Sequence, residues 1–178
     1  MENIKIYVAN LGKYNEGELV GEWLSLPATE EEIEQMYVRI KVAHYDEDGE
    51  FVPYYEEDGI IYEETAIHDY ESDFDNLSIG EWDSIEELNE LAEDIEPEDI
   101  ELLDAIIEVT GCTLKEAIDQ KWNVTYYSGM SLEDVAYELV EDCYNLDDFA
   151  KRYFDYEAFA RDLSFDGYTE TKNGVLFI

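Results

Sequence analysis

Carboxylates are the most numerous side chains in this sequence that could do chemistry, because Asp and Glu make up 48 of its 178 residues against only 10 Lys and Arg. Paired carboxylates serve as general acid and base in glycoside hydrolysis, and they hold metal ions in metal-assisted hydrolysis. So many acids create close pairs throughout the chain, and such pairs single out no catalytic residue. We therefore predict no catalytic residue, although a hydrolase built on a carboxylate pair remains one alternative.

The motifs for phosphate and calcium binding are incomplete. Gly12 and Gly17 have the spacing of a phosphate-binding loop, but Glu18-Leu19 follows where Lys and Ser or Thr would be needed. A calcium loop aligned on Gly49 begins at His44 instead of Asp and ends on a tyrosine instead of Glu. Loose cation binding is still open to the acids of this stretch, which are Asp46, Glu47, Asp48 and Glu50.

Histidine and cysteine offer little further chemistry. His44 and His68 lie in no zinc-binding spacing, and no signature supports a distant Cys–His catalytic pair. Cys112 and Cys143 are predicted to be buried free thiols, because Cys is frequently a small core residue. We expect neither a bound metal nor a cofactor.

The distribution of charge is more informative than any motif. The net charge of −38 opposes direct binding to nucleic acid, which depends on Lys and Arg, while 15 Tyr, 7 Phe and 3 Trp allow a folded core. Residues 42–114 hold 26 of the acids and no Lys or Arg. Because these carboxylates have no local counter-charge, they must face water, metal ions or the cations of a partner.

Residues 81–108 carry the densest charge, with 13 acids in 28 residues. A continuous helix of that length would present about one charge per 3.2 Å, close to the roughly 3.4 Å per charge of one DNA strand. This density predicts a surface that substitutes for DNA in a basic groove. The carboxylates that we expect to bind such a target are Glu63, Glu64, Asp69, Glu71, Asp73, Asp75, Asp83, Glu86, Glu87, Glu90, Glu93, Asp94, Glu96, Glu98, Asp99, Glu101, Asp104 and Glu108.

The hydrophobic pattern predicts a small sheet with one helix, then short helices, then a mixed unit. Capping boxes begin helices at Thr29, Ser84 and Thr113, Gly111 ends a helix, and Ser131 opens another. The expected fold is α+β, an elongated chain of three small subdomains at 1–72, 73–119 and 120–178. Its other elements are strands at 4–8, 19–26, 60–70, 122–126, 165–171 and 175–178, a turn at 10–17, an acidic loop at 45–59, a helix from Pro97 and short helices within 144–163.

Three blocks of the sequence resemble the ArdA family of antirestriction proteins. These blocks are YVANLGKYNEGELVGEW at 7–23, AIHDYE at 66–71 and YFDYEAFARDL at 153–163, the last being similar to the antirestriction motif of the family. They occur in the family's order and span nearly the whole chain. Phe159 and Ala160 depart from the pattern, since Tyr and Gly are common there.

The resemblance implies a DNA mimic of mobile elements that occupies the DNA groove of type I restriction-modification enzymes, especially their methyltransferase core. It also implies an elongated homodimer joined through its C-terminal domain, and no catalysis. Within the third block, Arg161 is predicted to form an ion pair with Asp155 or Asp162. The residues of the candidate dimer interface are Tyr153, Phe154, Asp155, Tyr156, Glu157, Phe159, Arg161, Asp162 and Leu163.

Two further expectations concern location and the competing function. No run of 18 apolar residues could span a membrane, and the first residues lack the pattern of a secretion signal, which together predict a cytoplasmic protein with no membrane partner. The chief alternative to a DNA mimic is an acidic, cation-binding globular protein of the calcium-binding type.

Overall fold

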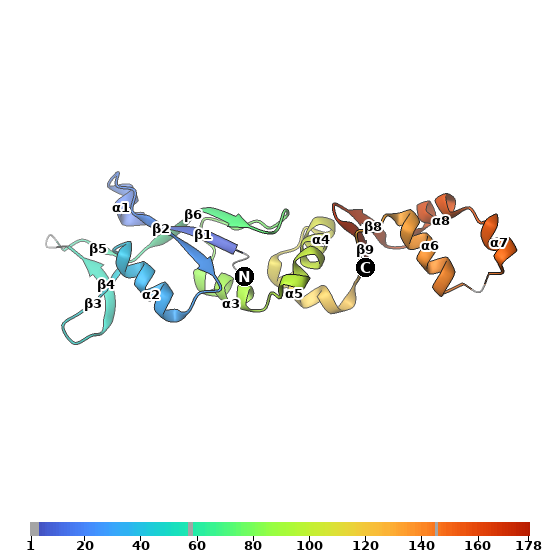
Figure 1. The fold of residues 1–178 in the computed structure, drawn as a ribbon. Helices are drawn as coiled ribbons and strands as arrows, with labels where there is room; N and C mark the ends of the chain where they lie inside the picture. Colours follow the sequence, from blue (N-terminus) through green and yellow to red (C-terminus); the bar gives the residue numbers. More distant parts are fainter. Residues whose placement is uncertain (1–3, 57–58, 145) are drawn as a thin grey trace. The chain divides into compact units, whose positions relative to one another are not determined.

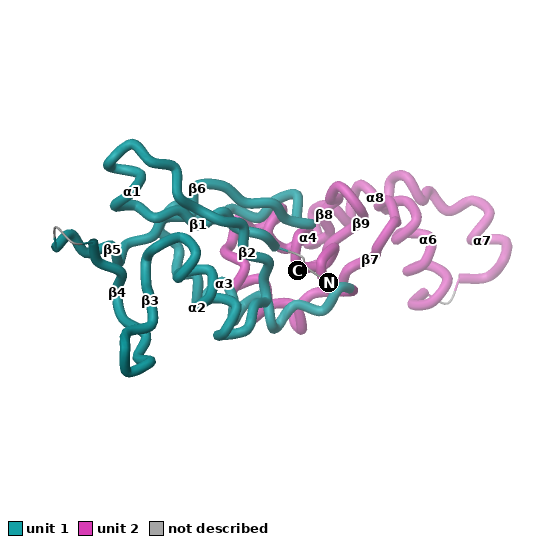
Figure 2. The backbone as a smooth tube through the Cα atoms, turned by 60° about the vertical axis from the view of Figure 1, so that its left-hand side comes forward, with its two compact units in different colours: residues 1–97 teal, residues 98–178 magenta. Residues whose placement is uncertain are grey.

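The computed structural model describes residues 4–56, 59–144 and 146–178. These residues form short helices and three antiparallel sheets of three strands each, which confirms the α+β class (Figure 1). The chain divides into two compact units, residues 1–97 and 98–178 (Figure 2). The boundary between these units falls within the predicted central subdomain, and the division into three parts remains a prediction.

The main sheet of the first unit has the strand order β2-β1-β6, with β1 at Ile4–Asn10, β2 at Gly21–Leu26 and β6 at Thr65–Ser72. Alternation along β1 places Ile4, Ile6 and Val8 in the core, where none has exposed surface. Helix α2, Glu30–Arg39, contacts β2 and buries Met36. The capping box predicted between Thr29 and Glu32 begins this helix.

A second sheet takes its middle strand from the stretch 45–59, which we expected to be an acidic loop. It has the order β3-β4-β5, with strands at Ala43–Tyr45, Phe51–Tyr55 and Ile61–Tyr62. The prediction of a loop throughout 45–59 was therefore wrong at β4, because the backbone of Phe51 to Pro53 pairs with that of β3 across an acidic turn. The Asp46 carboxylate holds this turn by accepting the backbone N–H groups of Asp48 and Glu50.

Two other predictions for this unit need correction. The predicted single strand at 60–70 is two strands, β5 and β6. The predicted turn at 10–17 contains a short helix, α1 at Leu11–Asn15, which the side chain of Asn10 caps by accepting the N–H of Lys13 at 2.9 Å. Asn10 is fully buried and also donates to the carbonyls of Ile40 and Lys41, so it joins three segments of the unit.

Helix α3, Ile85–Glu93, completes the first unit and packs against β2. Its buried side is formed by Ile85, Leu88 and Ala92. The Ser84 hydroxyl accepts the N–H of Glu87 as predicted and donates to the carboxylate of Glu86. The Glu87 side chain does not accept the backbone N–H of Ser84 within the described structure, so the second bond of the predicted capping box is missing.

The second unit begins with a 3₁₀ turn at Pro97–Asp99 that leads into α4, Ile100–Thr110. Gly111 ends α4 in the left-handed conformation, with a φ of 67°, which a residue with a Cβ adopts less readily. The predicted capping box of Thr113 and Glu116 begins α5, Leu114–Gln120. The strand expected at 122–126 starts later, because Trp122 lies in a second 3₁₀ turn, Lys121–Asn123.

The remaining elements of this unit are three helices and one sheet of order β7-β9-β8. Its core joins Val135, Ala136, Ala160, Leu163 and Val175. The helices are α6 at Leu132–Asp142, α7 at Asp148–Arg152 and α8 at Tyr156–Leu163, and the strands are β7 at Thr125–Ser128, β8 at Tyr168–Thr171 and β9 at Gly174–Phe177.

Two more observations bear on the predictions. Cys112 is half-buried and Cys143 is exposed, so the expectation that both thiols are buried was wrong, although both are free. Within the part of the chain that the structure describes, no helix has the length and apolar character needed to cross a membrane.

Candidate functional site

The candidate site is the set of 18 carboxylates predicted to bind a target. Sixteen of these residues are exposed. Helix α3 shows why, because its buried side takes the apolar residues and leaves Glu86, Glu87, Glu90 and Glu93 on the solvent side. The densest acidic segment, 81–108, is divided between the two compact units, with residues 98–108 in the second.

The two exceptions are Asp104, which lies within α4, and Asp99, the residue directly before this helix. Asp104 is only 6% exposed, and its neighbours from Leu103 to Ile107 are buried with it. Asp99 is half-buried and forms an ion pair with Lys121, whose Nζ lies 2.7 Å from Asp99 Oδ2. Neither side chain is therefore presented freely to a partner.

Glu101 and Glu108 of α4 are exposed but are already engaged within the second unit. Glu101 accepts the hydroxyl of Ser128 at 2.7 Å, and Glu108 accepts the backbone N–H of Lys172 at 3.1 Å. Each carboxylate keeps a second oxygen, so these hydrogen bonds orient the charge without neutralising it.

Several of the few cations are used in ion pairs within their own units. Arg39 donates to both carboxylate oxygens of Glu22, and this bond raises the pKa of Arg39. Lys151 pairs with Glu141 at 2.7 Å, and that hydrogen bond raises the pKa of Lys151. These two pairs lie outside residues 42–114, so they compensate none of the acids of that stretch, of which Asp99 pairs with Lys121 and Glu56 pairs with Lys13.

The most enclosed cation is Lys13, which is 4% exposed. Its ammonium donates to Glu56 at 2.7 Å, to the Tyr62 hydroxyl at 3.0 Å and to Glu16 at 3.0 Å. The bond to Glu56, followed by that to Tyr62, raises the pKa of Lys13 above its usual value. The hydrogen bond from Tyr62, followed by that from Lys13, lowers the pKa of Glu16. This cluster holds α1 against β5, and we assign it a structural role.

A family model of the antirestriction protein ArdA matches residues 6–177. The chain belongs to the ArdA family. A search of curated proteins finds no match. ArdA is a family of antirestriction proteins and not of enzymes, so the acidic surface belongs to a protein that acts against restriction.

The third block of the ArdA resemblance begins at Tyr153, directly after α7, and contains the whole of α8. Leu163 is 4% exposed and belongs to the core of the second unit, whereas Tyr153 is 76% exposed. The ring of Tyr156 stacks on Tyr137 of α6 with ring centroids 3.6 Å apart. The block therefore contains both core residues and surface residues.

The charged residues of this block are exposed. Arg161 lies 3.9 Å from Asp162, with both side chains more than two-thirds exposed. An ion pair of this kind contributes little to folding. Asp155 instead caps α8 by accepting the N–H of Ala158 at 2.9 Å. Of the two partners predicted for Arg161, the structure therefore shows Asp162.

Sequence reasoning missed one feature of the ArdA surface, a groove between α2 and α3. The groove encloses about 420 Å³. The two helices are separated by 45 residues of intervening chain, from 40 to 84, so no local pattern indicates that they lie side by side. The only available signal was that each helix repeats Glu at helical spacing, at Glu30 and Glu34 and at Glu86, Glu90 and Glu93.

Proposed function

We propose that this ArdA protein is a DNA mimic that occupies the DNA-binding groove of type I restriction-modification enzymes, at their methyltransferase core. It would thereby protect the incoming DNA of a mobile element from restriction. The observation that carries the proposal is the stretch 42–114, where 26 acids stand without a single Lys or Arg. Sixteen of the 18 carboxylates assigned to target binding are exposed, which supports the same conclusion.

Electrostatics supplies the driving force. DNA binding releases the counterions condensed on the duplex, and the affinity falls linearly with log salt concentration. An acidic protein surface of comparable charge density attracts the same Lys and Arg side chains. Competition with DNA follows, because one basic groove cannot hold two polyanions. No reaction and no cofactor is required.

We also propose that the protein acts in the cytoplasm, as a homodimer joined through the second unit. Aromatic side chains exposed on this unit support a protein interface there, since aromatic residues are enriched at such interfaces. Phe149 of α7 is 71% exposed, and its ring contacts that of the exposed Tyr153 at a centroid distance of 5.0 Å. Sedimentation of the wild type and of a Tyr153→Asp variant tests this, because a charge within the interface would shift the protein toward monomer.

The decisive experiment is competition for a purified type I methyltransferase core. Fluorescently labelled DNA is displaced by the protein at several salt concentrations, and the displacement is repeated with excess unlabelled DNA. We expect the protein to displace DNA, with an affinity that falls steeply as salt rises. An affinity that does not depend on salt, or inhibition that excess DNA leaves unchanged, would reject DNA mimicry. Ternary complexes of DNA, enzyme and inhibitor would reject it as well.

A further inference from the structure

The groove between α2 and α3 has acidic sides. On α2, Glu30 and Glu34 lie one turn apart, and on α3 the acids are Glu86, Glu90 and Glu93. All five line the groove. The groove, which we call the α2–α3 groove, is lined by Ala28, Thr29, Glu30, Ile33, Glu34, Tyr37, Phe51, Glu86, Asn89, Glu90 and Glu93, so no Lys or Arg is among these described residues.

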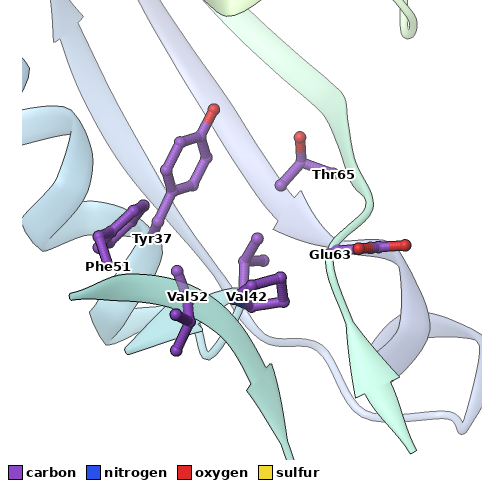
Figure 3. Close-up of a pocket in the computed structure, with 8 residues that line it drawn as sticks. Tyr37, Val42, Phe51, Val52, Glu63 and Thr65 are labelled. Carbon is purple, nitrogen blue, oxygen red and sulfur yellow. The ribbon is translucent and has the colours of Figure 1, made fainter. Parts of the chain in front are cut away.

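The other walls of the α2–α3 groove are apolar and aromatic. Ile33 and Tyr37 of α2 and Phe51 of β4 line it between the acids. Tyr37 and Phe51 also line an adjoining pocket of about 240 Å³, whose further walls include Val42 and Val52. Figure 3 shows the rings of Tyr37 and Phe51 close together at one side of this pocket, above Val52 (Figure 3). Aromatic rings and carboxylates therefore line the same groove.

The groove is held open by bonds between its sides. The Asn89 side chain of α3 accepts the backbone N–H of Ala28 at 2.7 Å and donates to the Ala28 carbonyl at 3.0 Å. The Tyr37 hydroxyl donates to Glu86 at 3.4 Å, and burial, followed by the charge of Glu86, raises the pKa of Tyr37 to about 12. Binding to such a preformed groove costs less ordering entropy than binding to mobile side chains.

Three of the five carboxylates remain available to a ligand. Glu34 accepts the Tyr45 hydroxyl at 2.6 Å, and Glu86 accepts from Tyr37 and Ser84. Within the described part of the chain, no hydrogen bond or ion pair engages Glu30, Glu90 or Glu93. Carboxylates on two sides of an aromatic groove are the complement of a flat cation that donates several hydrogen bonds and stacks on rings.

We propose that the α2–α3 groove binds an arginine side chain of the partner protein. The guanidinium presents five N–H donors in one plane, so it reaches carboxylates on both sides while its faces stack on Tyr37 or Phe51. The aliphatic stem packs on the apolar walls. A lysine of equal charge offers a compact ammonium that is held less well. The inference rests on the proposed function, in which the partner has a basic DNA-binding groove.

This site makes the surface more selective than a plain polyanion. A phosphate backbone attracts any cation of suitable charge, and sequence-independent DNA binding uses Lys and Arg alike. The α2–α3 groove adds shape and an aromatic face, which discriminate between the two. The protein thereby selects a partner surface rich in arginine.

The test compares the binding of hexa-arginine and hexa-lysine peptides to the full chain by calorimetry at physiological salt. We expect hexa-arginine to bind at least about fivefold more tightly, the effect of one guanidinium–aromatic contact with its added hydrogen bonds. The groove variant Glu90→Gln/Glu93→Gln lowers this ratio to within about twofold. The control variant Glu47→Gln/Asp48→Asn removes the same charge from an exposed turn and keeps the ratio.

A ratio near one for the wild type, or an equal loss in the groove and control variants, overturns the inference. A third variant, Phe51→Leu, keeps every charge and should lower the ratio as well, with circular dichroism showing that it folds. The competition experiment with DNA remains separate from this one. A protein that displaces DNA but does not prefer arginine refutes only the groove. A protein that prefers arginine but does not displace DNA refutes only the proposed function.

Discussion

Neutralising the acids on the solvent side of α3 should weaken inhibition while leaving the stability of the fold nearly unchanged. We consider Glu86, Glu87, Glu90 and Glu93 changed together to Gln, which removes four charges and keeps side-chain length. Three like-charge pairs at i,i+3 or i,i+4 disappear, at about 0.2–0.5 kcal/mol each, so folding gains about 0.6–1.5 kcal/mol. Two acids in the first turn no longer complement the helix dipole, which costs about 0.3–1 kcal/mol each. The free energy of unfolding should stay within about 1.5 kcal/mol of wild type.

Binding should respond quite differently to the same change. If each of the four carboxylates acts like one duplex phosphate, the slope of log affinity against log salt becomes shallower by up to about 3.6. The assay is displacement of labelled DNA from the methyltransferase core between 50 and 200 mM salt, and urea unfolding measures stability. A graded loss should appear as the substitutions are added one by one, because many charges share the interaction.

A matched variant controls for net charge. It removes four exposed acids from the second unit, which carries all six bases of residues 115–178, and we expect a smaller loss of inhibition from it. Equal losses from the two variants would contradict a defined acidic surface, and full inhibition by the α3 variant would contradict its role. Loss of activity from a single substitution would point instead to a catalytic carboxylate. The control substitutions are Glu133→Gln, Glu138→Gln, Asp142→Asn and Asp166→Asn.

Three further predictions concern the second unit. Leu163→Ala should lower the free energy of unfolding by about 2–5 kcal/mol because Leu163 is buried in the core, whereas Arg161→Ala should change it by less than about 0.5 kcal/mol; urea titration distinguishes these. Thr113→Ala should cost about 1 kcal/mol by removing the cap of α5, and an unchanged melting curve would contradict this. The Ser131 hydroxyl, followed by the Ser131 backbone N–H, lowers the pKa of Asp134. The ionised carboxylate therefore stabilises the fold above the pKa that Asp134 has in the unfolded chain, and this stabilisation is lost as the pH falls through its pKa in the folded protein. NMR titration of the Ser131→Ala variant should show a higher pKa for Asp134.

Local elements were predictable because their causes lie within a few residues. The capping boxes at Thr29 and Thr113 need only a hydroxyl and a carboxylate three residues apart, and both form as expected. Gly111 ends its helix for a similarly local reason. Strand β4 was missed because acids surround it, and a run of charge resembles a loop until a partner strand pairs with it.

The carboxylates of the site show the limit of sequence reasoning most clearly. Asp104 belongs to the same run of acids as Glu101 and Glu108, yet it alone is buried. Helix α4 contacts α5, β7, β8 and β9, and contacts on several sides enclose positions that an amphipathic pattern would leave exposed. The pairing of Asp99 with Lys121 likewise joins residues 22 apart in the chain. Such outcomes depend on packing between distant segments.

The sequence by itself determined the sign, amount and location of the charge, because charge is carried by each residue whatever its surroundings. It also determined where several of the helices begin, because caps act over three or four residues. Only the tertiary structure decided which carboxylates are presented, which are paired, and that the acids of α2 and α3 line one groove together with aromatic rings. Burial and facing are relations between segments far apart in the chain, so a linear pattern contains them only indirectly.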